Sequence, residues 1–240
     1  MRAGARVAQE PAIVWTRPQR GARGPAAEHT RTELAQAAVR LADRGGLAAV
    51  SMRQVGAELG TGQASLYRYL GSRDDLLDLM TDAVAGEIDL DVPLTGDPVE
   101  DLLALAVRAK DTRLRHPWLL DVPPEPLRIG PNGMDFLEYA LRALAPAGLP
   151  GRTGMETVAL LNALTEQFSR AELQTGRGLT GRQEAQTAYI GETAAQGGHP
   201  HLAAALAGQS QADPAQDEQL RFERIMRRAL AGLITQGAGS

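Results

Sequence analysis

The feature that most constrains this chain is a pair of very short helical segments joined by a tight turn. Residues 51–58 and 63–70 both show helical spacing, and Leu59-Gly60-Thr61-Gly62 interrupts the pattern between them. Helices of fewer than ten residues are unstable alone in water, so both must pack on the helices before and after them. The sequence therefore predicts a helix-turn-helix inside a compact head of roughly 50 residues.

Three capping boxes mark where the surrounding helices begin. In such a box, the N-cap side chain and the third helical residue each bond to the other's backbone. The pairs are Thr30 with Glu33, Ser51 with Gln54, and Ser72 with Asp75. The first helix is expected from about Arg31 to Arg44 and the fourth from Ser72 to about Ile88. Gly45-Gly46 ends the first, because glycine readily takes the left-handed conformation at a helix C-terminus.

Helical spacing continues to the end of the chain, and no alternating β-branched run of strand length appears. The further helices are expected at about 98–115, 133–144, 154–175, 182–195 and 214–236. The predicted fold class is therefore all-α, with a three-helix head and a helical bundle as the body. We expect an arm at 1–28, the head at 29–75 and the body at 76–240.

Charge is distributed unevenly along the chain. The net charge is -4, yet residues 1–73 hold 11 arginines against 5 acidic residues, which leaves -10 for residues 74–240. A basic end of this kind favours a polyanionic partner such as nucleic acid. The arm is rich in Arg, Pro, Gly and Ala without apolar periodicity, which predicts a flexible segment with Trp15 as its one anchor. A disordered tail that touches no DNA fits the same composition.

The sequence carries no pattern typical of an enzyme. It has no cysteine, which excludes disulfides and thiolate metal sites, and neither Gly-x-Ser-x-Gly nor His-Glu-x-x-His occurs. His199-Pro-His201 lacks a third metal ligand nearby. No apolar run has the length of a signal peptide or of a membrane span, so a cytoplasmic location is expected. We expect no enzymatic activity, no cofactor and no metal.

Residues 30–80 closely resemble the DNA-binding head of the TetR (tetracycline repressor) family. The resemblance rests on the glycine pair after the first helix, on Leu66-Tyr67 in the third helix and on the acidic start of the fourth. The body is similar, more loosely, to the tetracycline-repressor type of ligand domain through His116-Pro-Trp-Leu-Leu120. The resemblance implies a homodimeric repressor with a homeodomain-like head. It would bind a pseudo-palindromic operator and leave it when a small-molecule effector enters the body.

The resemblance also assigns roles to residues of the head. A recognition helix needs short or polar groups on its outer face to reach base edges. The third helix offers Gln63, Ala64 and Ser65 at base-reading positions, with Tyr67, Arg68 and Tyr69 on the same outer face. Phosphate contacts are expected from Ser51, Arg53 and Arg73, and arm contacts from Arg17, Arg20 and Arg23. The alternative is that both tyrosines are half-buried spacers on a solvated face.

Two further sets of residues are expected in the body. An apolar seam predicted to form a four-helix dimer interface comprises Val158, Leu161, Leu164, Phe168, Phe222, Met226 and Leu233. Polar and aromatic groups expected to reach a mainly apolar effector pocket are His116, Trp118, Tyr139, Arg142, Asn162 and Gln167. Each prediction has an alternative. The side chains of the seam could instead fill the core of the protomer, and the polar residues could instead make ordinary structural contacts.

Two rival functions remain open from the sequence alone. One is a regulator that is independent of a ligand or that activates transcription. The other is an all-α carrier or enzyme that retains a vestigial head.

Overall fold

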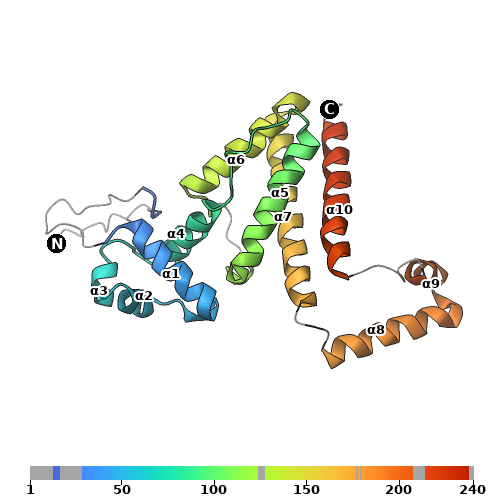
Figure 1. Cartoon of the computed structure of the whole chain (residues 1–240), viewed down its shortest axis with the longest axis horizontal. Helices are drawn as coiled ribbons and strands as arrows, with labels where there is room; N and C mark the ends of the chain where they lie inside the picture. The colour runs from blue at the N-terminus through green and yellow to red at the C-terminus, as the bar shows by residue number, and fades with distance from the viewer. Residues whose placement is uncertain are drawn as a thin grey trace, which may run out of the picture. The chain divides into compact units, whose positions relative to one another are not determined.

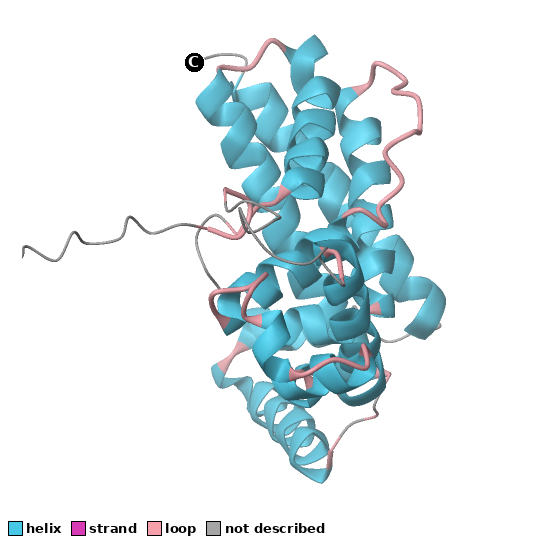
Figure 2. Ribbon diagram, turned by 90° about the vertical axis from the view of Figure 1, so that its left-hand side faces the viewer, coloured by secondary structure: helices cyan, strands magenta, loops and turns pink. Residues whose placement is uncertain are grey.

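The structure, a computed structural model, describes residues 13–16, 29–123, 128–176, 178, 180–207 and 214–237, the last range with its side chains from Glu218 onward. Every regular element within these ranges is a helix (Figures 1 and 2), which confirms the all-α prediction. None of the helices described is long and apolar enough to cross a membrane.

The described residues form two compact units. The first comprises residues up to Val92 together with Asp111–Ala140, and the second comprises Pro93–Lys110 and the chain from Leu141 onward. Helices α5 (Pro98–Arg115) and α6 (Pro131–Leu144) each continue from one unit into the other. The helices of the head therefore belong to the same compact unit as Asp111–Ala140.

The first unit contains the head helices. They are α1 (Arg31–Gly45), α2 (Met52–Glu58), α3 (Gln63–Leu66) and α4 (Arg73–Ala85), with short 3-10 turns η1 (Leu47–Ala49) and η2 (Pro117–Asp121). Their core includes the fully buried Leu34, Val55, Leu66 and Leu76, and Trp118 of η2 belongs to the same core. Val14 is also fully buried in this core, and the partly buried Trp15 packs against the core.

The three predicted N-caps are confirmed, but only one forms a full capping box. Thr30 Oγ1 accepts from Glu33 N at 3.1 Å, and Glu33 Oε2 accepts from Thr30 N at 2.7 Å. At Ser51, the Gln54 side chain accepts from the serine hydroxyl instead of from its backbone. Asp75 reaches one residue further back than expected, because its Oδ2 accepts from Gly71 N at 2.6 Å.

Two helices of the head are shorter than the sequence predicts. The third was expected over residues 63–70, but α3 ends at Leu66 and the chain turns over Tyr67 and the two residues after it. Hydrogen bonds of the 3-10 type, such as the one from Tyr69 N to Leu66 O at 2.9 Å, tighten this end of the helix. The fourth was expected to reach about residue 88, but α4 ends at Ala85, directly before Gly86.

The second unit is built from part of α5, the end of α6, and the helices α7 (Gly151–Thr175), α8 (Gly181–Thr193), α9 (Pro200–Ala207) and α10 (Pro214–Gly237). A short π-helical segment, η4 (Ala194–Gly198), follows α8. Helix α9 is not among the helices expected from the sequence. Helices α7 and α10 pack on each other, and their inner side chains form much of the core of this unit.

Candidate functional site

The turn between α2 and α3 sets the position of α3. Gly60 has a φ of 69°, a conformation that favours glycine, and Thr61 N donates to Gly56 O at 2.8 Å. A Cβ added at Gly56 would lie 2.8 Å from Thr61 O, so only glycine permits this approach. These contacts hold α3 against α2 in the helix-turn-helix arrangement expected from the sequence.

An ion-pair cluster joins α1 to α2. Glu58 accepts from Arg44 at 2.8 Å and from Arg40 at 3.4 Å. The hydrogen bond from Arg44 is the main cause of a lowered pKa for the Glu58 carboxyl. Glu58 therefore stays ionised at neutral pH and helps to fix α2 on α1.

Helix α3 is anchored by one side chain and exposes the others. Leu66 is fully buried, whereas Gln63, Ala64 and Arg68 are exposed and Tyr67 is 51% exposed. Ser65 is half-buried, and its hydroxyl accepts from Arg68 Nη2 at 2.9 Å. A short helix with a polar outer face of this kind has the form required to enter a major groove.

The two tyrosines after α3 differ in their surroundings. Tyr67 is exposed, and its hydroxyl lies 3.5 Å from Gln63 Nε2. Tyr69 packs against the core of the head, and its hydroxyl accepts from His29 N at 3.4 Å. The spacer role considered from the sequence therefore fits Tyr69 and not Tyr67.

The predicted phosphate contacts lie at helix starts. Arg53 in α2 and Arg73 at the first position of α4 are exposed, and neither has an ion-pair partner among the residues described. Ser51 is the N-cap of α2. Arg17, Arg20 and Arg23 lie outside the described residues.

The six residues predicted for an effector pocket are divided between the two units. His116, Trp118 and Tyr139 belong to the first unit, and Arg142, Asn162 and Gln167 belong to the second. The first three are buried and bonded within the protein: both His116 Nδ1 and Trp118 Nε1 lie within 2.8 Å of Asp43 Oδ1, and Tyr139 donates to Val92 O at 2.9 Å. They thus fit the alternative of structural contacts.

On the second-unit helices, Arg142 and Gln167 are exposed and Asn162 is half-buried on α7.

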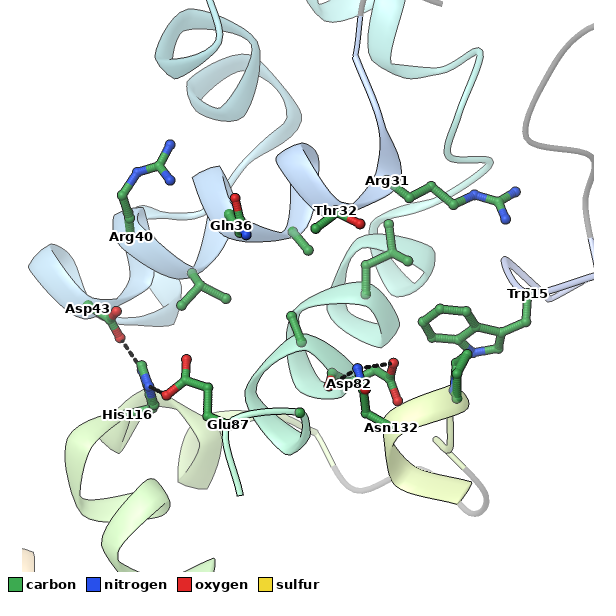
Figure 3. Close-up of a pocket in the computed structure, with 16 residues that line it drawn as sticks. Trp15, Arg31, Thr32, Gln36, Arg40, Asp43, Asp82, Glu87, His116 and Asn132 are labelled. Carbon is green, nitrogen blue, oxygen red and sulfur yellow. Dashed lines mark hydrogen bonds and ion pairs between the residues drawn. The ribbon is translucent and has the colours of Figure 1, made fainter. Parts of the chain in front are cut away.

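A pocket of about 780 Å³ lies in the first unit instead (Figure 3). Its walls come from α1, α4, the start of α6 and His116, with Trp15 at one end. Of the predicted effector residues, only His116 lines it. Sequence periodicity did not predict this pocket, because its walls combine α1 and α4 with residues such as His116, which lies 73 residues after its partner Asp43.

The predicted dimer seam is largely inside the protomer. Val158, Leu161, Phe222 and Met226 are each at most 1% exposed within the single chain. Phe168 packs edge-to-face on Phe222, with ring centroids 5.3 Å apart. Only Leu164, Phe168 and Leu233 keep partial exposure. The burial of the other four supports the alternative that these side chains fill the core.

The described residues contain no cluster of three or more histidine or acidic side chains placed to hold a metal ion. His199 and His201, considered from the sequence, are exposed at the start of α9.

Comparisons with known proteins agree with the arrangement of the head and the body. Residues 34–80 match the bacterial regulatory proteins of the tetR family, and residues 92–236 match the tetracyclin repressor-like C-terminal domain. The HTH-type transcriptional repressor DrrR1 of Streptomyces coeruleorubidus is 34% identical over 199 residues, which are 80% of this chain and 74% of DrrR1. An HTH-type transcriptional regulator of Saccharopolyspora erythraea is 31% identical over 225 residues, 93% of this chain and 92% of that protein.

Solved structures of the TetR family protein ActR from Streptomyces coelicolor share this fold. The structure in complex with actinorhodin superimposes with a TM-score of 0.73 at 29% identity and covers 88% of this chain and 99% of ActR. The structure in complex with (S)-DNPA gives a TM-score of 0.73 at 28% identity, covering 87% of this chain and 98% of ActR. Together with the exposed recognition helix, these matches show that the chain belongs to the TetR family and is a DNA-binding transcriptional repressor rather than an enzyme.

Proposed function

We propose that this repressor acts in the cytoplasm as a homodimer on a two-fold operator, with one α3 in the major groove of each half-site. The observation that carries the proposal is the outer face of α3, where Gln63 and Ala64 are exposed while Leu66 alone is fully buried. A two-fold dimer would place its half-sites about 10 base pairs apart or a multiple of that distance.

Each exposed group of α3 has a base edge that suits it. Gln63 has the donor and acceptor needed for bidentate binding to adenine, and Ala64 offers a methyl group to thymine. Ser65 has a hydroxyl that suits several bases, and Tyr67 lies along the DNA backbone. Arg53 and Arg73 bind phosphates, which fix the register of the head on DNA without reading its sequence.

Selection of bound DNA from a random pool identifies the operator, and two substitutions then test the roles. Gln63→Ala should change which base is preferred at one position of each half-site, at a cost of about 1 to 3 kcal/mol. Arg73→Ala should weaken binding to all sequences alike. Arg182→Ala is the matched control, because this arginine is exposed on α8, outside the head and outside the proposed dimer interface. If Gln63→Ala and Arg73→Ala both reduced affinity uniformly, the registry proposed for α3 would be wrong.

We also propose that the arginines of the arm, Arg17, Arg20 and Arg23, add contacts in the minor groove or along the backbone. The test replaces all three by alanine and keeps the segment itself, because Val14 belongs to the core of the head. The slope of log affinity against log salt concentration should fall in magnitude. An unchanged slope would remove the arm from the interface.

For the dimer, we propose that α7 and α10 meet their copies through the residues that the protomer leaves exposed. Met155 and Leu160 of α7 are each 45% exposed, and Ala159 and Ala163 continue the same stripe. On α10, Leu220 is 61% exposed. The exposed Arg152 and Glu156 lie on the same side of α7, so a second copy would cover a surface of mixed apolar and charged side chains.

A Met155→Glu, Leu160→Glu double variant should sediment as a monomer at concentrations where the wild-type protein is a dimer. Tyr189→Glu on α8 is the control, because this side chain is 61% exposed and lies outside the proposed interface. A double variant that remains folded and dimeric would place the interface elsewhere.

We propose, finally, that a small molecule releases the repressor from its operator. ActR has been solved in complex with actinorhodin and with (S)-DNPA, and that likeness supports an effector for this chain as well. Asn162, half-buried on α7, is the predicted body residue that we retain as a contact. For release, the effector must bind the DNA-incompetent conformation more tightly than the DNA-binding one. A ligand with equal affinity for both conformations does not shift the equilibrium between them.

Actinorhodin is the first probe to add to a gel-shift assay with the selected operator, followed by a wider set of aromatic metabolites. Release at micromolar concentration would support an effector-controlled repressor. Specific DNA binding that no compound alters would favour a regulator independent of a ligand, and the absence of any specific, salt-sensitive DNA binding would favour a carrier with a vestigial head.

A further inference from the structure

The pocket of the first unit combines two acidic ends with an apolar middle. Its volume of about 780 Å³ is within the range of small-molecule sites. Apolar side chains of α1 and α4 line its centre: Ala35, Val39, Leu79 and Ala83. Figure 3 shows Asp43, His116 and Glu87 together at one end, and Asp82, Asn132 and Trp15 at the other.

At the first end, His116 lies between two carboxylates. Its Nδ1 is 2.7 Å from Asp43 Oδ1, and its Nε2 is 3.0 Å from Glu87 Oε2. The same two oxygens take the other bonds as well, because Asp43 Oδ1 accepts from Trp118 Nε1 and Glu87 Oε2 accepts from Arg115 Nη1, each at 2.8 Å. Carboxylates only accept, so both bonds of His116 form together when each ring nitrogen carries a proton.

This arrangement uses one oxygen of each carboxylate and spares the other. Within the described part of the chain, Asp43 Oδ2 and Glu87 Oε1 have no hydrogen-bond partner. The Asp43 side chain is 34% exposed and that of Glu87 is 37% exposed, and both line the pocket. Two acceptor oxygens thus remain available to a donor that enters the pocket.

The second end places a buried carboxylate beside an indole. Asp82 is 7% exposed, and its oxygens accept from Gly133 N at 2.9 Å and from Asn132 Nδ2 at 3.0 Å. A Cβ added at Gly130 would lie 2.4 Å from both the Asp82 carboxyl carbon and Trp15 Cζ2, so the indole and the carboxylate are neighbours across this glycine. An aromatic face next to a carboxylate favours cations, and Arg31, which lines the pocket beside Trp15 (Figure 3), supplies one cation of the protein itself.

The basic groups at the His116 end balance the charge of the two carboxylates, but they leave one oxygen of each carboxylate without a donor. Arg40, the basic neighbour on α1, directs its guanidinium to Glu58 of α2. Arg115 and His116 each engage the carboxylate oxygen that is already occupied. The spared oxygens of Asp43 and Glu87 therefore face the pocket as hydrogen-bond acceptors of negative charge.

We propose that this pocket binds an organic ammonium compound with an apolar, preferably aromatic, body. The ammonium group donates to Asp43 Oδ2 and Glu87 Oε1, since charge-assisted bonds of this kind are strong and an ammonium has three donors. The apolar body lies along Ala35, Val39 and Leu79 toward the indole of Trp15. The site lies between α1 and α4 of the DNA-binding unit, so it is distinct from an effector site in the helical body.

Calorimetric titration with three probes of one shape tests the proposal without DNA. The probes are 2-(1-naphthyl)ethylamine, the neutral 2-(1-naphthyl)ethanol and the anionic 1-naphthaleneacetate. The amine should bind at least tenfold more tightly than the alcohol, and the acetate should not bind. Equal affinity for the three probes, or no binding of the amine at millimolar concentration, would overturn the proposal.

Two variants locate the amine. Glu87→Gln keeps an oxygen for His116 and Arg115 but removes the charge, and should weaken amine binding about tenfold without affecting the alcohol. Asp121→Asn, an exposed acid of η2 that does not line the pocket, is the matched control and should change affinity less than twofold. Unchanged amine binding by Glu87→Gln would refute the assigned end of the pocket.

A second pair of variants tests the indole independently of the carboxylates. Trp15→Ala should weaken binding of both the amine and the alcohol, whereas Trp15→Phe, which keeps an aromatic ring, should retain most of the affinity. Thermal unfolding of each variant in the absence of probe separates lost binding from lost folding. If Trp15→Ala bound the amine as the wild type does, Trp15 would not be part of the site.

Discussion

A buried lysine in the second unit gives the sharpest test of the energetics. Lys110 of α5 has a side chain that is 3% exposed, and its Nζ lies 2.7 Å from Glu172 Oε2 of α7 and 2.7 Å from Gln219 Oε1 of α10. The ammonium also lies 5.2 Å from the centroid of the Phe222 ring. One cation therefore connects three helices.

Removing Glu172 and removing Lys110 should lower the free energy of unfolding by different amounts. Glu172→Ala leaves a buried ammonium with only an amide oxygen and a ring, which should cost about 3 kcal/mol, at the low end for a broken buried pair. Lys110→Met leaves no buried charge, and the thioether side chain fills most of the space. The Glu172 carboxylate is 35% exposed and regains water, so this variant should lose only about 1 kcal/mol.

The assay is urea unfolding followed by far-UV circular dichroism at one fixed protein concentration, because dimerisation makes stability depend on concentration. Tryptophan fluorescence is unsuitable here, since Trp15 and Trp118, the only two in the chain, both lie in the first unit. Glu192→Ala is the control, because this exposed acid of α8 lies outside the proposed dimer interface and should contribute less than about 0.5 kcal/mol. A Lys110→Met variant that loses as much stability as Glu172→Ala would refute the argument from exposure.

Three further outcomes follow from single contacts. Leu66→Ala should lower the stability of the head by about 2 to 5 kcal/mol in thermal or urea unfolding, because this fully buried side chain is the only one that anchors α3. Gly130→Ala should displace the Trp15 indole, which a Cβ would approach to 2.4 Å, and a red-shifted tryptophan emission relative to wild type would report it. The hydrogen bond from Arg227 lowers the pKa of the Glu100 carboxyl, so the stability it contributes is present above the ordinary pKa of about 4.3 and is lost as pH falls through the folded value. Stability curves of wild type and Glu100→Gln should therefore converge as the pH falls below the folded pKa of Glu100, and curves that stay parallel would contradict this linkage.

Local chemistry explains why the head was predictable from the sequence. Thr30, Ser51 and Ser72 mark helix starts with side chains that bond to the backbone three residues on, and all three were found as N-caps. Such signals involve neighbours in the sequence, so no knowledge of the tertiary structure is needed to interpret them. The errors lie at helix ends: Tyr67 continues the periodic pattern but already belongs to the turn, because periodicity does not report where the hydrogen-bond ladder stops.

The seam on α7 and α10 shows a different limit. Helical spacing correctly grouped Val158, Leu161, Phe222 and Met226 on inward faces, since all four are buried. The same spacing describes a face that packs on a neighbouring helix of the protomer and one that packs on a second copy. Only the structure separates them, by leaving Met155 and Leu160 of α7 exposed while the more regular stripe is covered.

The contacts of His116 and Trp118 explain why the pocket was missed. Polar side chains on apolar helices were expected to face a ligand, yet Trp118 and His116 meet Asp43, a residue more than 70 positions earlier in α1. A buried polar group requires a partner, but its own sequence neighbourhood does not say whether the protein or a ligand supplies it. Asp43 looked like an ordinary acid near the end of a solvated helix, and nothing local distinguishes it from Asp121 or Glu156. Asp43 differs from them because folding brings His116, the indole of Trp118 and a second carboxylate, Glu87, close to it. One oxygen of each carboxylate then remains without a donor, and this property exists only after folding.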